Sequence, residues 1–241
     1  MTLAGKTILI TGAARRIGQS LAIAMAKAGA DVIIHHGNSA QEASQTAEMI
    51  EQLGRQAWVL SADFSQPEAV EGFIEKANHL APLFAIVNNA AVFEPLSLQN
   101  TSLASWQRAL DINLTVPFLL SRDFASQLRE GSQGRIVNIL DWRALRPGAD
   151  HFAYTVSKAA LAAMTQSMAA ALAPRITVNG LAMGAILPPS DGGDTSRVIQ
   201  QVPAARWARL EEVAQSLQFL LDGPDFITGE ILYLDGGRHL V

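Results

Sequence analysis

Short apolar runs alternate with longer amphipathic stretches along the whole 241-residue chain. The apolar runs have the length of buried strands, and the amphipathic stretches carry apolar residues at helical spacing. Strands are predicted at 7–11, 32–35, 57–60, 84–87, 135–140, 176–178 and 231–234. Helices are predicted at 16–28, 40–53, 68–78, 103–129, 154–172 and 210–221. Such alternation is typical of parallel βαβ units with helices on both faces of the sheet.

The order of these elements predicts the fold class and the domain organisation. Right-handed crossovers generate an open twisted sheet, so we expect an α/β fold with a Rossmann-type, doubly wound parallel sheet of about seven strands. No linker or repeat divides the sequence, so residues 1–241 are predicted to form a single domain. The stretch 183–202 is too long for an ordinary connection and contains several prolines and glycines. We therefore expect this stretch to be a substrate lid.

Composition narrows the class of protein. Hydrophobic residues make up 49% and charged residues 17% of the chain, a balance typical of a globular enzyme. The net charge of -4 and the lack of a long basic tract predict no nucleic-acid partner, and the lack of a long apolar run predicts no membrane span. The absence of cysteine excludes thiolate chemistry, and no signal peptide is evident. We expect a cytoplasmic protein that acts on a small molecule.

A glycine-containing loop follows the first predicted strand and leads into the first helix. It reads Thr-Gly-Ala-Ala-Arg-Arg-Ile-Gly from Thr11 to Gly18. At such a position the free backbone N–H groups of a helix start can bind a dinucleotide pyrophosphate. Gly12 would permit the tight turn, and Gly18 would permit close packing of the helix on the strand. The loop therefore predicts a dinucleotide cofactor.

The residues around this loop favour NADP(H) over NAD(H). An NAD-specific site usually has an acidic residue at the end of the second strand, but here that strand ends at His36 without a carboxylate. Arg15 and Arg16 could bind a 2′-phosphate through bidentate, charge-assisted hydrogen bonds. Ser39 could add a neutral hydrogen bond. We therefore predict NADP(H) as the cofactor.

Tyr154 and Lys158 stand four residues apart at the start of a predicted helix and would share one helical face. A phenol is a poor acid–base catalyst near neutral pH because its pKa is about 10. A nearby ammonium stabilises the phenolate and is expected to lower this pKa. The pair could then donate a proton to a substrate as a hydride arrives.

Taken together, these motifs make the chain resemble the short-chain dehydrogenase/reductase family over essentially its whole length. The resemblance implies that Asp63 contacts the adenine, that Asn89 and Ala90 line the cofactor, and that Asn113 holds a water in a proton relay with Lys158. It also implies a homotetramer built through the two long predicted helices, 103–129 and 154–172. The cofactor residues that we expect are Gly12, Arg15, Arg16, Ile17, Gly18, His36, Asn38, Ser39, Asp63, Phe64, Asn89, Ala90, Ala91, Tyr154, Lys158 and Gly184.

Departures from the usual family pattern point to a subgroup. Arg16 stands where the loop usually has glycine, and Asp141 stands where a serine usually precedes the catalytic tyrosine by thirteen residues. Both departures, together with Phe93, resemble the pteridine reductases and dihydromonapterin reductases, in which the phenylalanine stacks on the pterin. Other positions differ: Asn38 stands where this subgroup often has a phosphate-binding arginine, and Ala91 stands where it often has serine.

The function expected from these residues is NADPH-dependent reduction of a dihydropteridine or a similar heterocycle. Tyr154 and Asp141 would handle the proton, with Lys158 and Asn113 in support, and Phe93 and Arg16 would position the ring. Two alternatives stay open: an NADP(H)-linked ketone or acyl reductase, and a non-catalytic NADP(H)-binding regulator. The pocket is expected to be shaped by Trp142, Arg143, His151 and Phe152, with Trp207 either closing it or packing beneath it.

Overall fold

Seven parallel strands form one sheet in the order β3-β2-β1-β4-β5-β6-β7 in the computed structural model, which describes residues 3–188 and 196–241. The order reverses between β1 and β4, as in a doubly wound sheet. The predicted fold class is confirmed. The strands are β1 Thr7–Ile10, β2 Asp31–His36, β3 Ala57–Ser61, β4 Leu83–Asn88, β5 Gly134–Asp141, β6 Ile176–Met183 and β7 Ile231–Leu234.

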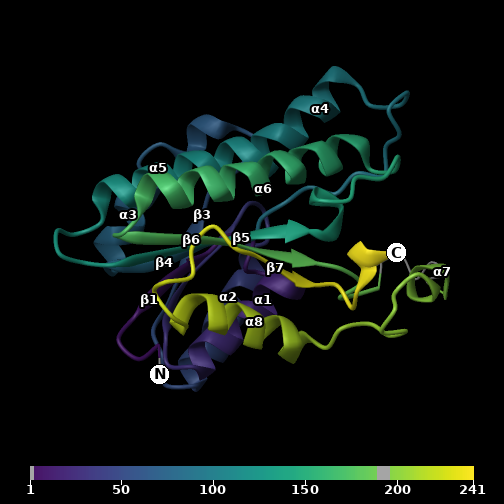
Figure 1. Ribbon diagram of the computed structural model, residues 1–241. Helices are drawn as coiled ribbons and strands as arrows, with labels where there is room; N and C mark the ends of the chain where they lie inside the picture. Colours follow the sequence, from purple (N-terminus) through teal and green to yellow (C-terminus); the bar gives the residue numbers. More distant parts are fainter. Residues whose placement is uncertain (1–2, 189–195) are drawn as a thin grey trace.

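Helices cover both faces of the sheet (Figure 1). One layer holds α1, α2 and α8, and the opposite layer holds α3, α4, α5 and α6. The short helix α7 lies beyond the carboxyl edge, near the C-terminus of the chain. The helices are α1 Arg16–Lys27, α2 Ala40–Gln52, α3 Phe73–Leu80, α4 Leu103–Leu110, α5 Val116–Gln127, α6 Phe152–Leu172, α7 Ser196–Gln200 and α8 Leu210–Asp222.

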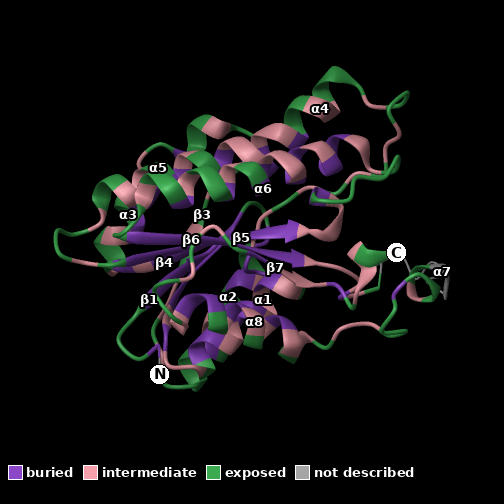
Figure 2. Cartoon of the chain, viewed as in Figure 1, coloured by how far each residue is buried: buried purple, intermediate pink, exposed green. Residues whose placement is uncertain are grey.

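The core lies in two layers, between the sheet and each set of helices (Figure 2). The central strands are buried along almost their whole length, because helices cover both of their faces. These strands therefore read as continuous apolar runs rather than as alternating ones. Within the described residues, no helix combines the length and the apolar character that a membrane span needs.

Two predicted helices are interrupted. The predicted helix 68–78 divides into a 3₁₀ turn at Pro67–Val70 and helix α3, because Gly72 between them adopts a left-handed backbone with φ of 68°. The predicted helix 103–129 contains a π-helical turn at Asp111–Thr115, which separates α4 from α5. The hydrophobic pattern continues through this turn, so the interruption was not predicted.

Strand β6 is longer than the predicted strand 176–178. The Asn-Gly pair at 179–180 resembles a turn in sequence, yet both residues lie inside the strand. Asn179 donates a side-chain hydrogen bond to the Ile227 carbonyl at 2.9 Å and accepts one from the Glu230 N–H at 3.0 Å. Pairing with β5 on one side and β7 on the other therefore overrides the local turn preference.

Candidate active site

A cleft of about 1600 Å³ lies at the carboxyl ends of the strands. Residues that follow four different strands line it: Gly12 after β1, Asn89 after β4, Asp141 at the end of β5 and Gly184 after β6. In open parallel sheets, ligands bind at this edge where the strand order reverses. Single-ligand pockets usually measure roughly 300–1000 Å³, so this cleft has room for a dinucleotide and a second molecule.

The glycine loop is built for close backbone approach. Gly12 has a φ of 63°, and a Cβ at Gly18 would stand 2.1 Å from the Gly12 carbonyl oxygen. The Asn89 side chain donates hydrogen bonds to the Thr11 and Gly12 carbonyls at 2.8 and 3.2 Å, which fixes the loop against the end of β4. This rigid loop at the start of α1 fits the pyrophosphate of a dinucleotide.

His35 ties the glycine loop to the next two strands. Its Nδ1 accepts a hydrogen bond from the Gly12 N–H at 3.1 Å, and its Nε2 lies 3.0 Å from the Ala62 carbonyl. The ring stacks on Phe64 with centroids 3.8 Å apart. Burial lowers the pKa of His35 to about 4, with a small contribution from His36, against the opposing hydrogen bond to Ala62. The imidazole is therefore neutral at neutral pH, with its proton on Nε2.

Two residues expected at the cofactor do not border the cleft among the described residues. Side chains alternate along β2, so His35 faces the cleft while the His36 side chain is buried, and its Nδ1 has no hydrogen-bond partner. Ser39 is buried at the start of α2. The expected cofactor contacts of His36 and Ser39 stay predictions, and the structure adds His35, which sequence reasoning did not name, to the lining of the cleft.

The buried neutral state of His35 predicts a specific dependence of stability on pH. The unfolded chain binds the proton near pH 6.5, whereas the folded chain binds it only near pH 4, so stability is lost as pH falls through this window. Replacing His35 with glutamine should reduce the loss of unfolding free energy between about pH 7.5 and about pH 5 by roughly 2 kcal/mol.

Urea unfolding at the two pH values measures this difference, and comparing the differences cancels the cost of the substitution itself. A matched His79→Gln variant, at an exposed position of α3, should behave like the wild type. If His35→Gln shows the same pH-dependent loss as the wild type, His35 is not buried in its neutral form.

Two arginines lie at the end of the cleft beside the glycine loop, where the phosphates of a dinucleotide are expected and which we call the phosphate end. Arg15 forms an ion pair with Glu42 at 3.6 Å, and both side chains are largely exposed. Arg16 has a left-handed backbone with φ of 54° and donates a hydrogen bond to the Pro188 carbonyl at 3.1 Å. Both side chains line the cleft together with Asn38. The positive φ at Arg16 explains why glycine is the usual residue at this point of such a loop.

The expected adenine end is lined by Asp63 and Phe64. The Asp63 carboxylate accepts hydrogen bonds from the Ser65 hydroxyl at 2.7 Å and the Ser65 N–H at 3.0 Å, and these bonds lower the pKa of Asp63. The carboxylate is therefore held ionised at the rim. The remaining predicted cofactor residues also line the cleft: Ile17, Gly18, Ala90, Ala91 and Gly184.

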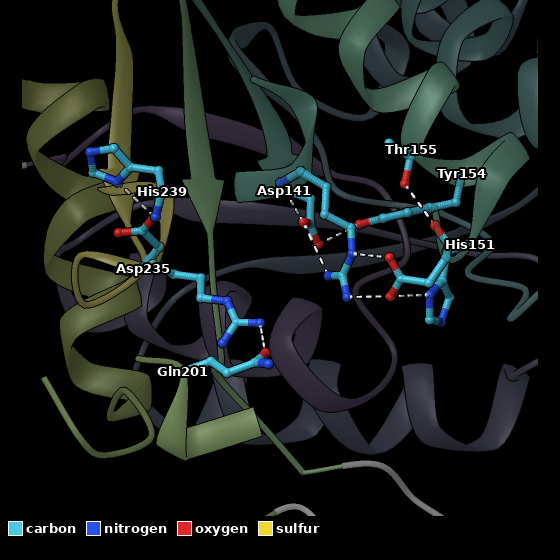
Figure 3. Close-up of polar contacts among 10 residues, drawn as sticks. Asp141, His151, Tyr154, Thr155, Gln201, Asp235 and His239 are labelled. Carbon is cyan, nitrogen blue, oxygen red and sulfur yellow. Dashed lines mark hydrogen bonds and ion pairs between the residues drawn. The ribbon is translucent and has the colours of Figure 1, made fainter. Parts of the chain in front are cut away.

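Tyr154, Asp141 and Lys158 meet at the floor of the cleft. Figure 3 shows Asp141 and Tyr154 pointing toward one another, and the phenol donates a hydrogen bond to the Asp141 carboxylate at 3.1 Å. Lys158 is buried, and its ammonium donates a hydrogen bond to the Ile139 carbonyl at 2.7 Å. Its Nζ lies 5.9 Å from the centroid of the Tyr154 ring.

The expectation that Lys158 lowers the pKa of Tyr154 is wrong for this arrangement. Burial raises the pKa of Tyr154 well above 10, and the negative charge of Asp141 raises it further; only Arg143 opposes this. Burial also lowers the pKa of Lys158 to about 8. The chain's own groups therefore hold Tyr154 as a protonated phenol, which is the form of a proton donor.

Asn113 lies behind the cleft, in the π-helical turn. Its side-chain oxygen accepts a hydrogen bond from the Val92 N–H at 2.9 Å, and its nitrogen donates to the Val92 carbonyl at 3.1 Å and to the Ser157 hydroxyl at 3.0 Å. These bonds fix the segment that leads to Phe93. Among the described residues Asn113 does not border the cleft, so its expected contact with a relay water stays a prediction.

One wall of the cleft is aromatic and charged. Phe93 is 53% exposed, stacks on His151 with centroids 4.0 Å apart and meets the Tyr154 ring edge-on at 4.6 Å. Arg143 lies over the Phe93 ring at 6.0 Å and pairs with Asp150 at 2.9 Å. Phe93 is thus a partly open wall residue rather than a core aromatic. No pattern in the sequence predicted that Arg143 and Asp150 form an ion pair.

Of the other residues expected to shape the pocket, some line the cleft and one does not. Trp142 and Trp207 line the cleft, whereas Phe152 is not among the described lining residues and stacks instead with Trp106. The described parts of the predicted lid, 183–188 and 196–202, contribute lining residues including Leu187, Val198 and Val202. The rest of that stretch, with Pro189, Gly192 and Gly193, lies outside the described residues. Among the described residues, no group of His, Asp and Glu could hold a metal ion.

Comparisons with known proteins agree with this geometry. A family model described as enoyl-(acyl carrier protein) reductase matches residues 12–239. The chain is 32% identical over 245 residues to 2-dehydro-3-deoxy-D-gluconate 5-dehydrogenase from Bacillus subtilis, with 98% of this chain and 95% of the relative covered.

Two solved structures match over nearly the whole chain. FolM alternative dihydrofolate reductase 1 from Brucella canis, complexed with NADP, is 34% identical with a TM-score of 0.92, covering 100% of this chain and 97% of that one. A short-chain dehydrogenase from Burkholderia cenocepacia, in complex with NADP, is 34% identical with a TM-score of 0.92 and covers 99% of both chains. The chain therefore belongs to the short-chain dehydrogenase/reductase family of NAD(P)-dependent oxidoreductases.

Proposed function

We propose that this enzyme is an NADPH-dependent reductase that transfers a hydride to a pteridine ring, such as that of dihydrobiopterin, dihydromonapterin or dihydrofolate. The observation that carries this proposal is the hydrogen bond from the Tyr154 phenol to the Asp141 carboxylate, on the floor of the cleft. The resemblance to the pteridine reductase subgroup and the similarity to a protein described as an alternative dihydrofolate reductase support it.

The phosphate end of the cleft supports NADP(H) as the cofactor. Gly12 and Gly18 give the close backbone approach that a pyrophosphate needs, and Arg15 and Arg16 line the same end, where their guanidinium groups would bind a 2′-phosphate. The end of β2 carries His35 and His36 rather than the carboxylate typical of NAD sites. The cofactor, when bound, supplies the hydride.

The charge of Asp141 favours a C=N bond over a C=O bond as the reacting group. Arg143 holds the carboxylate through its backbone N–H at 2.9 Å and its guanidinium at 3.5 Å. An ionised carboxylate repels a carbonyl oxygen, on which negative charge develops during reduction. The nitrogen of an imine instead becomes an N–H group during reduction. This N–H can donate a hydrogen bond to a carboxylate. The Asp141 position thus suits a heterocycle.

Tyr154 is the proposed proton donor. Its raised pKa keeps the phenol protonated, so it can pass a proton to a ring nitrogen as the neighbouring ring carbon receives the hydride. The phenolate that remains lies in the same part of the cleft as Lys158, whose Nζ is 5.9 Å from the centroid of the Tyr154 ring. Phe93 is half exposed, and the part of its ring that neither His151 nor Tyr154 covers offers an apolar surface to the ring of the substrate.

A substrate panel tests this function. Oxidation of NADPH, followed by its loss of absorbance, should occur with dihydrobiopterin, dihydromonapterin or dihydrofolate, and NADH should be a poorer cofactor. Simple ketones should react slowly. Turnover of ketones without turnover of pteridines would contradict the proposal and favour an NADP(H)-linked carbonyl reductase. Binding of NADPH without turnover of any substrate would favour a regulatory protein.

A further inference from the structure

Beyond the proposed reaction site, the cleft continues along Trp142 to the C-terminal turn. This turn, a 3₁₀ segment at Arg238–Leu240, follows β7. The guanidinium carbons of Arg143 and Arg238 lie 4.9 and 4.8 Å from the Trp142 ring centroid, and all three residues line the cleft. Two guanidinium groups so close to one indole make this part of the cleft wall strongly cationic.

The two arginines differ in how their charges are balanced. Arg143 pairs with Asp150 at 2.9 Å and lies 3.5 Å from Asp141. Arg238 takes part in no ion pair among the described residues. It donates to the Val198 carbonyl at 3.3 Å and to the neutral side chain of Gln201, which directly follows α7 (Figure 3). A guanidinium has five N–H donors, so several remain for a ligand.

A third arginine adds to the positive charge at this end. Arg146 donates to the backbone carbonyl of Arg238 at 3.4 Å, and its side chain is exposed. Burial lowers the pKa of Arg238, and the positive charges of Arg143 and Arg146 lower it further, against a weaker effect of Asp150. The guanidinium groups of Arg143, Arg146 and Arg238 therefore repel one another, and an anion bound at Arg238 would relieve this repulsion.

We propose that the substrate carries a carboxylate on the side remote from its reducible ring, and that Arg238 binds this carboxylate beside Trp142. The inference rests on the proposed function, because the ring must occupy the cleft beside Phe93 and Tyr154 for its substituent to extend toward Trp142. The enzyme would then prefer pteridines with an acidic side chain, such as dihydrofolate, over those with an uncharged one, such as dihydrobiopterin.

The charge available at this position fits a carboxylate better than a phosphate. A carboxylate carries one negative charge and matches the planar fork of one guanidinium. A phosphate monoester carries about -1.5 to -2 charges and is usually bound by several cations or by a row of backbone N–H groups. Arg143 is already paired with Asp150, so of the two guanidinium groups beside Trp142 only Arg238 has no carboxylate partner among the described residues.

Steady-state kinetics with a matched pair of substrates tests the proposal. For Arg238→Gln, KM for dihydrofolate should rise about tenfold or more with little change in kcat, because one charge-assisted contact is lost. KM for dihydrobiopterin should stay within about twofold. The control Arg146→Gln removes a positive charge nearby at a position outside the lining, and it should change KM for dihydrofolate only slightly.

Each other outcome overturns a distinct statement. If Arg238→Gln raises KM equally for both substrates, Arg238 only tethers α7 and does not recognise a carboxylate. If the wild type does not favour dihydrofolate and Arg238→Gln changes nothing, the inference is wrong while the proposed function stands. If the wild type reduces neither pteridine, the proposed function is wrong and the inference falls with it.

Discussion

Replacing Tyr154 with phenylalanine is expected to lower kcat for pteridine reduction by about a hundredfold to ten-thousandfold, the usual contribution of a general acid. The substitution removes the hydroxyl that donates to Asp141 and keeps the ring that packs edge-on against Phe93. KM should therefore change little. Single-turnover oxidation of bound NADPH measures the chemical step directly, without interference from product release.

The chain offers a matched control for this experiment. It contains only two tyrosines, and the other, Tyr233, stacks on His239 and is not among the described residues that line the cleft. Tyr233→Phe should retain wild-type kcat. If Tyr154→Phe keeps more than about a tenth of wild-type kcat, Tyr154 is not the proton donor, since loss of a general acid costs more than that.

Replacing Asp141 with serine is expected to lower kcat/KM for pteridines by roughly a hundredfold and to raise the rate with simple ketones. The serine hydroxyl could donate a hydrogen bond to a carbonyl oxygen, whereas the carboxylate repels it. The substitution also removes one cause of the raised pKa of Tyr154, so the phenol should ionise at a lower pH than in the wild type. The rate with each substrate class, measured across pH, reports both effects.

A second substitution separates charge from shape at this position. Asp141→Asn keeps the size of the side chain and removes its negative charge, so it should also impair pteridine reduction. Asp123→Ser, in α5 and outside the described lining of the cleft, serves as the control and should behave like the wild type. If Asp141→Ser reduces pteridines as fast as the wild type, the proposed role of the carboxylate is wrong.

The sheet and the glycine loop could be predicted because their signals are local. Each strand forms a short apolar run, and the loop from Thr11 to Gly18 is continuous in sequence. The position of Asp141 relative to Tyr154 was also accessible, because β5 ends at that aspartate and α6 begins two residues before that tyrosine. The hydrogen bond between them follows from these two elements.

The remaining features of the site depend on which face of a strand a side chain lies on, on how deeply it is buried, or on contacts between residues distant in sequence. Neighbouring side chains along β2 point to opposite faces, so the sequence did not reveal that His35 rather than its neighbour lines the cleft. The sign of the pKa shift of Tyr154 depends on the depth of its burial, which no local pattern contains. Trp142 and Arg238 are distant in sequence and meet only through folding.

The π-helical turn at Asp111–Thr115 has a consequence for how this region tolerates change in length. It amounts to one inserted residue in an otherwise continuous helix, and one residue corresponds to about 100° of rotation about the helix axis. The insertion lets α4 face α6 while α5 faces α3 and the sheet. Deleting a single residue there would restore a regular helix and turn Asn113 away from Val92. This short turn therefore fixes the rotation of the packed face of α4 relative to that of α5.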